Sequence, residues 1–559
     1  MAGAQPLVDV ENLTFRYRRA TEPAIRDISL SVAPGEVLLV AGPSGCGKST
    51  LIRAINGLIP HSYPGDLTGE VRIEGQRTTD LRLRDIALTV GTILQDPAKQ
   101  IVGSTVESEL AFGPENLGLP RDEIASRIDE VILRAGIGNL AGRETAHLSG
   151  GERQLLAAAG ILMMRPRLFV VDEPLANLDP RTAAHLLRLL RDLADDGNAV
   201  VIVEHRVEEA LGLAPDQVLY LEDGGARYLG ALPGFLQVAD PESVKLPFEI
   251  VLQRVRERAA AGDQPGDPGP ERTAPPGATD AAADVPRLEF RSVSAGYGDK
   301  TILRNVDARL GRREVVAVLG PNGSGKTTLF RTAMRLLQPT SGEVFVDGRA
   351  ASDRTVAQLA TVFGYVFQSP SQMLFARTVR EELLFGPTNL GRDPRLFDEI
   401  IADSLRRTAI DSIEGILDRP PLTLSFGQQK RLALAIALTL QPPTLILDEP
   451  SAGQDHRTAR RFMQEVLAVD GLESLYLVTH DVDLALTHAD RILLLRDGHV
   501  VADGPPAQVI EDEERWIACN LRPTSLLRAN AQWRHAGGRL LDAERLAAEM
   551  VARERIGAT

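Results

Sequence analysis

Cysteine is nearly absent from this sequence, which has two, Cys46 and Cys519, among 559 residues. Neither lies in a cluster with the spacing of a metal site, and a pair of this kind makes no disulfide framework. The scarcity excludes a small disulfide-stapled secreted fold and favours a reducing compartment, the cytoplasm.

Aromatic side chains and an excess of basic charge are also missing. Aromatic residues make up 4% of the sequence, and the formal net charge is −14. Proteins that bind nucleic acid display basic surfaces and often stack bases on aromatic rings. We therefore expect no nucleic-acid partner, although a local basic patch stays compatible with this composition.

Long hydrophobic runs are missing as well. The longest runs, such as 199–203, have the length of a strand, whereas a bilayer span needs about 20 apolar residues. The first residues lack the basic and apolar regions of a signal peptide. If the protein serves a membrane, we expect it to do so as a peripheral protein on the cytoplasmic face.

The sequence does contain an internal repeat. GPSGCGKST at 42–50 returns as GPNGSGKTT at 320–328, and LSGGE at 148–152 returns as LSFGQ at 424–428. The acidic segment VVDEP returns as LILDEP, and a histidine follows each, all with offsets of 275 to 278 positions. So many landmarks in one order at nearly one offset mean two copies of one domain.

The composition changes between the copies. Residues 259–286 are rich in Ala, Gly, Pro and Asp, so they bury too little surface to fold and are predicted to form a flexible linker. We expect a first domain at 1–258, a second at 287–520 and a partly helical tail at 521–559. Within this tail, 539–555 show helical apolar spacing. That helix either packs on its own domain or serves association.

In each copy, apolar runs end in a glycine-rich turn, in acidic residues or in histidine. EVLLVAG and EVVAVLG precede glycine-rich turns, LFVVDEP and TLILDEP end in acids, and AVVIVEH and SLYLVTH end in histidine. Apolar strands of this kind are typical of a mostly parallel sheet that binds ligands at the carboxyl ends of its strands. The expected fold class is therefore α/β in both copies.

Both glycine-rich turns match G-x-x-x-x-G-K-[ST] after an apolar strand. The glycines let backbone N–H groups curl around phosphate, and the following helix N-terminus attracts the same anion. Lys48 and Lys326 would reach the β- and γ-phosphates of ATP, while Ser49 and Thr327 would hold Mg²⁺. The alternative, a glycine turn with an incidental lysine, is disfavoured by the duplication. The predicted phosphate-loop residues are Gly42, Gly45, Gly47, Lys48, Ser49 and Thr50, and Gly320, Gly323, Gly325, Lys326, Thr327 and Thr328.

Cys46 lies inside the first phosphate loop, beside Lys48 and at the predicted helix N-terminus. Both neighbours favour a thiolate over a thiol. We expect either an unusually reactive cysteine or an inert small filler.

An acidic pair ends an apolar strand in each copy, and a histidine ends the next apolar run. The first acid can orient Mg²⁺ through water, and the second can polarise the attacking water as a general base. The histidine is predicted to contact the γ-phosphate. A solvated strand end or a structural histidine is the alternative for a single copy. The two sets are Asp172, Glu173 and His205, and Asp448, Glu449 and His480.

The motif LSGGE places Ser149 23 residues before Asp172, and LSFGQ places Ser425 23 residues before Asp448. With the phosphate loops and acids, this motif resembles the signature of the ABC ATPases, from about residue 7 to about residue 510. The resemblance implies an antiparallel β subdomain and a helical signature subdomain beside the mostly parallel core sheet of each copy.

Further residues occupy positions that have known roles in this family. The resemblance implies that Tyr17 and Tyr297 stack on adenine. It places Gln95 and Gln368 at the Q-loop position, among the nucleotide and Mg²⁺ contacts. Asp179 and Asp455 match the D-loop aspartates.

In this family two domains pack head to tail, with each ATP between one phosphate loop and the opposite signature. The resemblance pairs the loop of Lys48 with Ser425 and Gly427, and the loop of Lys326 with Ser149 and Gly151. One chain could therefore build both sites. The signature would offer a hydroxyl, N–H groups and a helix N-terminus to the γ-phosphate.

The signatures also depart from the family pattern. Phe426 replaces the first glycine in the second copy, and Glu152 replaces the usual glutamine in the first. The serine and the second glycine remain in both copies. We expect two competent sites, with an asymmetric pair as the alternative.

The segments after the Q-loop glutamines narrow the choice within the family. LQDPAKQIVGSTVESELAFGPENLGLP and FQSPSQMLFARTVREELLFGPTNLG, together with Glu204 before His205, resemble the energy-coupling factor ATPases of vitamin and cobalt importers. The resemblance implies that this surface receives coupling helices of a membrane T-component, and that a small substrate-binding S-component completes the importer. Both components would lie on separate chains, and the sequence does not identify the cargo.

Other functions remain open at this point. One is a soluble tandem-ABC factor that acts on ribosomes or repair complexes. Tandem-ABC factors of translation usually carry a long charged helical linker, whereas the linker expected here is short and rich in proline and glycine. A regulatory module with decayed sites is disfavoured by the intact Lys, Glu and His residues. A sugar- or peptide-importer ATPase is disfavoured by the FGP-x-N-L-G segments.

Overall fold

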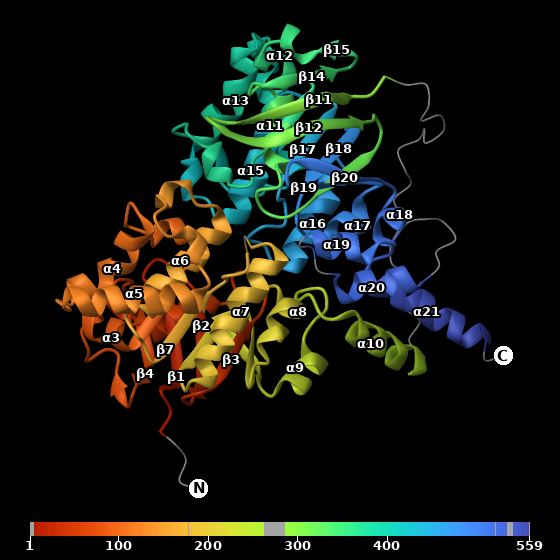
Figure 1. Ribbon diagram of the computed structural model, residues 1–559. Coiled ribbons are helices and arrows are strands. Elements are labelled where there is room, and N and C mark those ends of the chain that lie inside the picture. The colour runs from red at the N-terminus through yellow and green to blue at the C-terminus, as the bar shows by residue number, and fades with distance from the viewer. Residues whose placement is uncertain are drawn as a thin grey trace. The chain divides into compact units, whose positions relative to one another are not determined.

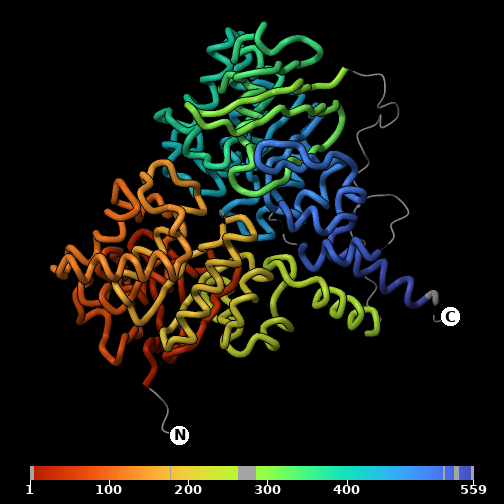
Figure 2. Tube along the Cα trace, in the orientation of Figure 1, coloured from red at the N-terminus to blue at the C-terminus, as the bar shows by residue number. Residues whose placement is uncertain are grey.

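The computed structural model describes residues 5–176, 178–261, 285–519, 521, 523–533 and 540–557. The chain forms two compact units. The first is Met1–Leu246 with Gly453–Thr458, and the second is Pro247–Ala452 with Ala459–Thr559. Figure 2 follows the course of the chain by residue colour.

The core sheet of the first unit has six strands in the order β10-β9-β3-β8-β7-β6. All neighbours pair in parallel except β10, which is antiparallel to β9. Strands β3 and β8 are buried along their whole length, which explains their unbroken apolar sequences. The strands are β3 (Val37–Ala41), β6 (Val90–Ile93), β7 (Leu168–Asp172), β8 (Ala199–Val203), β9 (Gln217–Glu222) and β10 (Gly225–Gly230).

A second, antiparallel sheet of the first unit has the order β2-β1-β4-β5. Strand β2 buries residues on one face and exposes those on the other, as expected for a sheet with one face on the core. Its inner face shares one hydrophobic core with the central sheet. The strands are β1 (Val8–Tyr17), β2 (Ile25–Val32), β4 (Gly65–Ile73) and β5 (Gln76–Arg77).

Helices complete the first unit. Helices α4, α5 and α6 pack on one another and form the helical subdomain (Figure 1). Helix α1 is the next element after β3 in the sequence. The helices are α1 (Lys48–Ile55), α2 (Leu58–His61), α3 (Leu83–Thr89), α4 (Val106–Asn116), α5 (Arg121–Ala135), α6 (Gly150–Leu162), α7 (Pro180–Asp195), α8 (Val207–Ala210) and α9 (Leu232–Val238).

The second unit repeats both sheets with the same topology. Its core sheet runs β16-β17-β18-β13-β19-β20, and its antiparallel sheet runs β12-β11-β14-β15. The strands are β11 (Leu288–Tyr297), β12 (Lys300–Leu310), β13 (Val315–Leu319), β14 (Ser341–Val346), β15 (Arg349–Ala350), β16 (Phe363–Val366), β17 (Thr444–Asp448), β18 (Ser474–Val478), β19 (Arg491–Arg496) and β20 (His499–Gly504). The expected α/β class, with a mostly parallel core sheet, an antiparallel sheet and a helical subdomain in each copy, is confirmed.

The helices of the second unit follow the same plan. Helices α13, α14 and α15 form its helical subdomain around a separate hydrophobic cluster. The helices are α11 (Lys326–Ala333), α12 (Val356–Ala360), α13 (Val379–Asn389), α14 (Phe397–Arg407), α15 (Phe426–Leu438), α16 (His456–Leu467, of which the part from Ala459 on belongs to this unit), α17 (Val482–His488), α18 (Pro506–Ile510) and α19 (Glu513–Ala518).

Helix α10 (Phe248–Ala260) belongs to the second unit by its contacts, although it follows the first domain in the sequence. It packs on the C-terminal helices α20 (Ser525–Gln532) and α21 (Ala543–Gly557) (Figure 1). Arg256 Nε donates to Glu554 Oε2 at 3.1 Å between α10 and α21. The expected tail helix is thus present and packed within its unit, while residues 262–284 of the predicted linker lie outside the described residues.

Candidate nucleotide sites

The first phosphate loop joins β3 to α1 in a conformation that requires glycine. Gly42 and Gly47 have φ of 147° and 104°. A Cβ atom on Gly42 would lie 2.3 Å from Leu221 O, and one on Gly47 would lie 2.5 Å from Ala24 O. At Gly45, with φ of 81°, a Cβ would meet no described atom within 4 Å. The loop is therefore closed against the protein and open on the other side, as a phosphate cradle must be.

Helix α1 begins at Lys48 directly after this loop. In the described structure no side chain caps the N-terminus of α1 or of its counterpart α11. The first N–H groups of an uncapped helix can donate to an anion, which the helix dipole also attracts. Lys48 Nζ lies over the loop, donating to Gly42 O at 2.9 Å and to Pro43 O at 2.7 Å.

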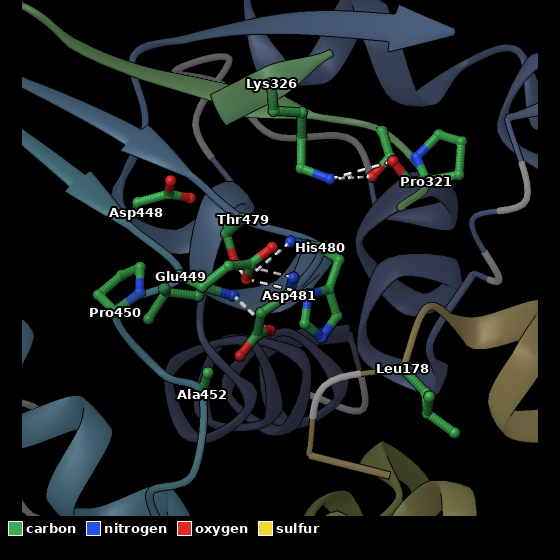
Figure 3. Close-up of polar contacts among 12 residues, drawn as sticks. Leu178, Pro321, Lys326, Asp448, Glu449, Pro450, Ala452, Thr479, His480 and Asp481 are labelled. Carbon is green, nitrogen blue, oxygen red and sulfur yellow. Dashed lines mark hydrogen bonds and ion pairs between the residues drawn. The ribbon is translucent and has the colours of Figure 1, made fainter. Parts of the chain in front are cut away.

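The second phosphate loop repeats this geometry. Gly320 and Gly325 have φ of 152° and 107°, and a Cβ on Gly320 would lie 2.2 Å from Leu495 O. Lys326 Nζ donates to Gly320 O at 2.8 Å and to Pro321 O at 3.1 Å (Figure 3). Gly323, with φ of 81°, again leaves open space, since no described atom lies within 4 Å of a Cβ placed there.

Cys46 fills the inside of the first loop. Its side chain is buried, and burial raises the pKa of the thiol despite the opposing charge of Lys48. Ser324 is buried at the matching position of the second loop. The structure supports the inert filler and not the reactive thiolate.

The acids at the ends of β7 and β17 fit a bound Mg²⁺. Thr327 Oγ1 and Tyr365 OH each donate to Asp448 Oδ2 at 2.9 Å. The other oxygen, Asp448 Oδ1, is buried without a hydrogen-bond partner among the described residues, and so is Asp172 Oδ1. Burial, together with the charge of the adjacent glutamate, raises the pKa of Asp172 and of Asp448 to about 6.

A bound cation would compensate the negative charge of these carboxylates and contact their unpartnered oxygens. Mg²⁺ is usually held by one or two protein oxygens, with water and nucleotide phosphates as its other ligands. Asp172 and Asp448 with the hydroxyls of Ser49 and Thr327 form such sets. Consistent with this mode, the described residues contain no cluster of three or more His, Cys, Asp or Glu side chains that could hold a metal alone.

The predicted general bases have an unusual backbone conformation. Glu173 and Glu449 have φ of 45° and 50°, in the left-handed region that residues with a Cβ rarely adopt. Each backbone N–H donates to the neighbouring strand, Glu173 to Val203 O at 3.0 Å and Glu449 to Val478 O at 2.7 Å. The turn thus fixes both side chains at the carboxyl end of the core sheet.

In the first unit, three predicted site residues meet at Glu173. His205 Nε2 lies 2.6 Å from Glu173 Oε1, and Gln95 Nε2 donates to Glu173 Oε2 at 2.7 Å. Burial opposes the charge of Glu173, but the hydrogen bond and charge of His205 outweigh it and lower the pKa of the carboxyl. An ionised carboxylate at neutral pH is what a water-polarising base requires.

In the second unit, Glu449 has a related set of partners (Figure 3). Thr479 Oγ1 donates to Glu449 Oε2 at 3.2 Å, and His480 Nδ1 lies 2.9 Å from the same oxygen. Burial again opposes the charge, yet His480 lowers the pKa of Glu449. The two histidines therefore approach their glutamates through different ring nitrogens.

The two signature serines cap the helices that follow them. Glu152 N donates to Ser149 Oγ at 3.3 Å, and Ser149 N donates to Glu152 Oε2 at 2.7 Å. Ser425 and Gln428 make the same reciprocal pair on α15. This capping box accepts either Glu or Gln at its third position, so the departure at Glu152 leaves the helix start unchanged.

The signature serines are exposed, Gly427 is half-buried and Gly151 is buried. The pairing of each signature with the phosphate loop of the other copy stays a prediction.

The predicted adenine-stacking tyrosines lie next to the phosphate-loop helices. Tyr17 OH is 3.2 Å from Thr50 Oγ1 and accepts from Arg53 at 2.9 Å. Tyr297 is half-exposed and accepts from Arg331 at 3.3 Å. Gln368 follows β16, as Gln95 follows β6, and Asp179 caps α7 through Thr182 N.

Several residues that shape the sites were missed or left without a role by the sequence reasoning. Glu204 is buried, and burial raises its pKa to about 7. Its carboxylate accepts from His205 N at 3.0 Å and Leu175 N at 2.8 Å, so it holds the histidine and the loop after Glu173. Arg206 contacts the loop after Glu173, and Lys430 contacts the loop after Glu449. A signal existed, since the two copies carry different charges at these matched positions.

A model of the ABC transporter family matches the chain twice, at residues 25–176 and 303–452. The chain is also similar to proteins named as ABC transporter ATP-binding proteins. One from Methanosarcina acetivorans is 33% identical over 548 residues, covering 93% of this chain and 89% of that protein. One from Streptomyces coelicolor is 35% identical over 543 residues, covering 90% of this chain and 95% of that protein.

A solved structure, cbiO1 from Clostridium perfringens, is described as part of the ABC transporter complex cbiONQ. It is 32% identical to this chain and covers 43% of it, with 96% of its own length included and a TM-score of 0.37.

Proposed function

The chain belongs to the ABC transporter family, and from this premise we propose that it hydrolyses ATP to drive a membrane importer of the energy-coupling factor type. The cargo class would be a vitamin or a transition-metal ion. The membrane T-component and the small S-component would lie on other chains, with this protein at the cytoplasmic face of the membrane. Among the described residues, no helix is both long enough and apolar enough to cross a membrane.

The proposal is supported first by the loops that follow the Q-loop glutamines. Glu109 is buried, and its Oε2 accepts from Val102 N at 2.8 Å and Gly103 N at 2.6 Å. Glu382 Oε2 accepts from Phe375 N at 2.9 Å and from the next N–H at 2.8 Å. These are the glutamates of the two TV-x-x-E segments. Each one pins its loop in a defined shape.

The pinned loops and the helices that follow them, α4 and α13, present apolar side chains to solvent. Phe375 is 65% exposed and lies edge-on to Phe385, which is 52% exposed, with ring centroids 4.8 Å apart. Val102 and Phe112 occupy the matching positions of the first unit and are 62% and 51% exposed. Large exposed apolar side chains in a rigid setting favour a protein partner. This observation carries the proposal, because it suits the apolar end of a coupling helix.

The same segments lead to the catalytic machinery. Gln95 contacts Glu173, and its chain continues directly to the loop that holds Val102. A change at the nucleotide can therefore move the exposed loop through the backbone, without any further relay. This connection supports a transport role over a decayed regulatory module.

Docking can be tested with the exposed aromatic pair. We expect the double variant Phe375→Asp/Phe385→Asp to lose co-purification with a co-expressed T-component and to lose cargo uptake. Basal ATP hydrolysis should stay within about twofold, since neither residue contacts the nucleotide machinery. Val102→Asp/Phe112→Asp tests the first unit in the same way. Ile517→Asp on α19 is the matched control, because Ile517 is 60% exposed outside the helical subdomain.

Two results would contradict the proposal. One is unchanged docking and uptake in both aromatic double variants. The other is co-sedimentation of the protein with ribosomes, combined with membrane recovery that does not depend on any membrane component. The second result would favour a ribosome-associated tandem-ABC factor.

A further inference from the structure

The two units hold the loop after the general base by different means. In the first unit, Arg206 donates to Leu175 O at 2.7 Å and to Leu178 O at 3.1 Å. Glu204 accepts from Leu175 N. Both charged residues follow β8, on either side of His205. The loop after Glu173 is thus fixed from the histidine segment.

The second unit has Thr479 and Asp481 at the matching positions. Asp481 Oδ1 accepts from Leu484 N at 3.1 Å and caps α17. The cation that holds the loop comes from the signature helix α15. Lys430 Nζ donates to Pro450 O at 2.8 Å, to Ala452 O at 2.7 Å and more weakly to Glu449 O at 3.4 Å.

Figure 3 shows Glu449, Pro450 and Ala452 along this loop after β17. Three carbonyl acceptors match the three donors of an ammonium group. The carbonyl oxygens contacted by Lys430 include that of the general base itself. A shift of α15 therefore acts on Glu449 through a single side chain.

The first unit makes a different contact from the same helix position. Gln154 is the counterpart of Lys430, and its Nε2 donates to Leu94 O at 3.3 Å, just before Gln95. The signature helix is thus tied to the Q-loop in the first unit and to the catalytic loop in the second.

Lys430 also lies over an aromatic ring, that of Phe426. Lys430 Nζ lies 5.3 Å from the centroid of the Phe426 ring, one helical turn earlier on α15. An ammonium over an aromatic face is stabilised and partly shielded from water. At Gly150, the counterpart of Phe426, a Cβ would meet no described atom within 4 Å, so space alone does not exclude a side chain in the first unit. Phe426 and Lys430 occur together in the second unit.

A buried ammonium is costly and needs compensation. Lys430 is 3% exposed. Burial lowers its pKa to about 7, while the negative charge of Glu449 acts in the opposite direction. The second unit therefore places a desolvated amine beside its general base, at a position where the first unit uses the side-chain amide of Gln154.

We propose that Lys430 is a positioning residue for Glu449. The Lys430 side chain joins the signature helix to the catalytic loop, and it does so in the second unit alone. Glu173 is positioned instead by Arg206 and Glu204. The loop after the general base is then held by the signature helix in the second unit and by the histidine segment in the first, while the histidine segment contacts the carboxylate in both. This inference rests on ATP hydrolysis and not on import, so it can be tested without a membrane partner.

The test isolates each general base by single-turnover hydrolysis in the full-length protein. In a Glu173→Gln background, where Glu449 carries the turnover, we expect Lys430→Gln to slow hydrolysis about 10- to 100-fold, as for a misplaced catalytic group. ATP affinity should stay unchanged, and Lys430→Arg should retain most of the rate. In a Glu449→Gln background, where Glu173 carries the turnover, Lys430→Gln should slow hydrolysis far less than it does in the Glu173→Gln background.

A transplant provides the converse experiment and does not require the Lys430 variants to fold. Arg206→Gln should slow the turnover that depends on Glu173, and adding Gly150→Phe with Gln154→Lys should restore it in part. Equal losses in both backgrounds, with lowered thermal stability, would overturn the proposal in favour of a general packing role. Failure of the transplant to restore any rate would also overturn it.

Discussion

His205 Nε2 lies 2.6 Å from Glu173 Oε1. The contact serves two purposes at once, because it orients the predicted base and keeps that base ionised. His480 reaches Glu449 through Nδ1, so the two units achieve the same electrostatic result with different ring orientations.

This relationship predicts the pH dependence of His205→Ala. His205 lowers the pKa of Glu173 against the effect of burial. Without the imidazole, burial should raise that pKa, so Glu173 stays protonated to a higher pH. In a Glu449→Gln background, the acidic limb of the rate profile should move to higher pH, and the maximal rate should fall about tenfold or more. An unmoved acidic limb with a reduced maximal rate would show that His205 acts on the phosphate alone.

A second prediction concerns the glutamates themselves. Glu173→Gln with Glu449→Gln preserves side-chain shape and removes the charge that polarises water. We expect Mg²⁺-ATP to bind, seen as an increase in thermal stability, while steady-state hydrolysis falls at least about 100-fold. Hydrolysis at the wild-type rate would mean that other groups are the general bases.

The sequence predicted the parts of this molecule that are encoded in short local motifs. The phosphate loops, the acids at the ends of β7 and β17, and the histidines after β8 and β18 all follow from local patterns. The capping-box role of Glu152 was also readable, since Ser and Glu stand three positions apart before an apolar run.

Other features depend on contacts between distant segments. Arg206 and Lys430 hold equivalent loops from non-equivalent elements, and only the packing of α15 against the loop after β17 reveals the second contact. The positive φ of Glu173 and Glu449 was likewise unpredictable, because the preceding strand and the following proline do not require it.

A third prediction follows from the raised pKa of Asp448. A carboxyl whose pKa is about 6 in the folded state and 3.8 when it is free in water binds its proton more tightly in the folded protein. The stability that comes from this tighter proton binding is fully present at a pH below the pKa of the unfolded state, and it is lost as the pH rises through about 6. Above this pH, the charged Asp448 therefore destabilises the nucleotide-free protein by up to about 3 kcal/mol.

Asp448→Asn should relieve this penalty. We expect a higher thermal midpoint of the nucleotide-free protein at pH 7.5, and a gain that shrinks as the pH is lowered from 7 towards 5. The stabilisation by Mg²⁺-ATP should be reduced in the same variant. Asp172→Asn serves as the matched test in the first unit, where the pKa is also about 6. A lower midpoint at pH 7.5 in both variants would contradict the argument.

The last prediction separates backbone strain from charge at the general base. Glu449 has φ of 50°, a conformation that costs a residue with a Cβ about 1 kcal/mol or more. Glu449→Ala and Glu449→Gly both remove the carboxylate, but glycine alone relieves the strain. The glycine variant should therefore be the more stable of the two by about 1 kcal/mol, even though glycine loses more entropy on folding.

The measurement is the midpoint of unfolding in denaturant, compared between the two variants. Ala402→Gly is the control, because Ala402 is exposed within the regular helix α14. There the same change from alanine to glycine should destabilise by about 1 kcal/mol. Opposite signs at the two positions would identify a strained turn that holds the base in place. If glycine destabilises at both positions, the left-handed conformation carries no cost, and the hydrogen bonds of Glu449 alone must hold it.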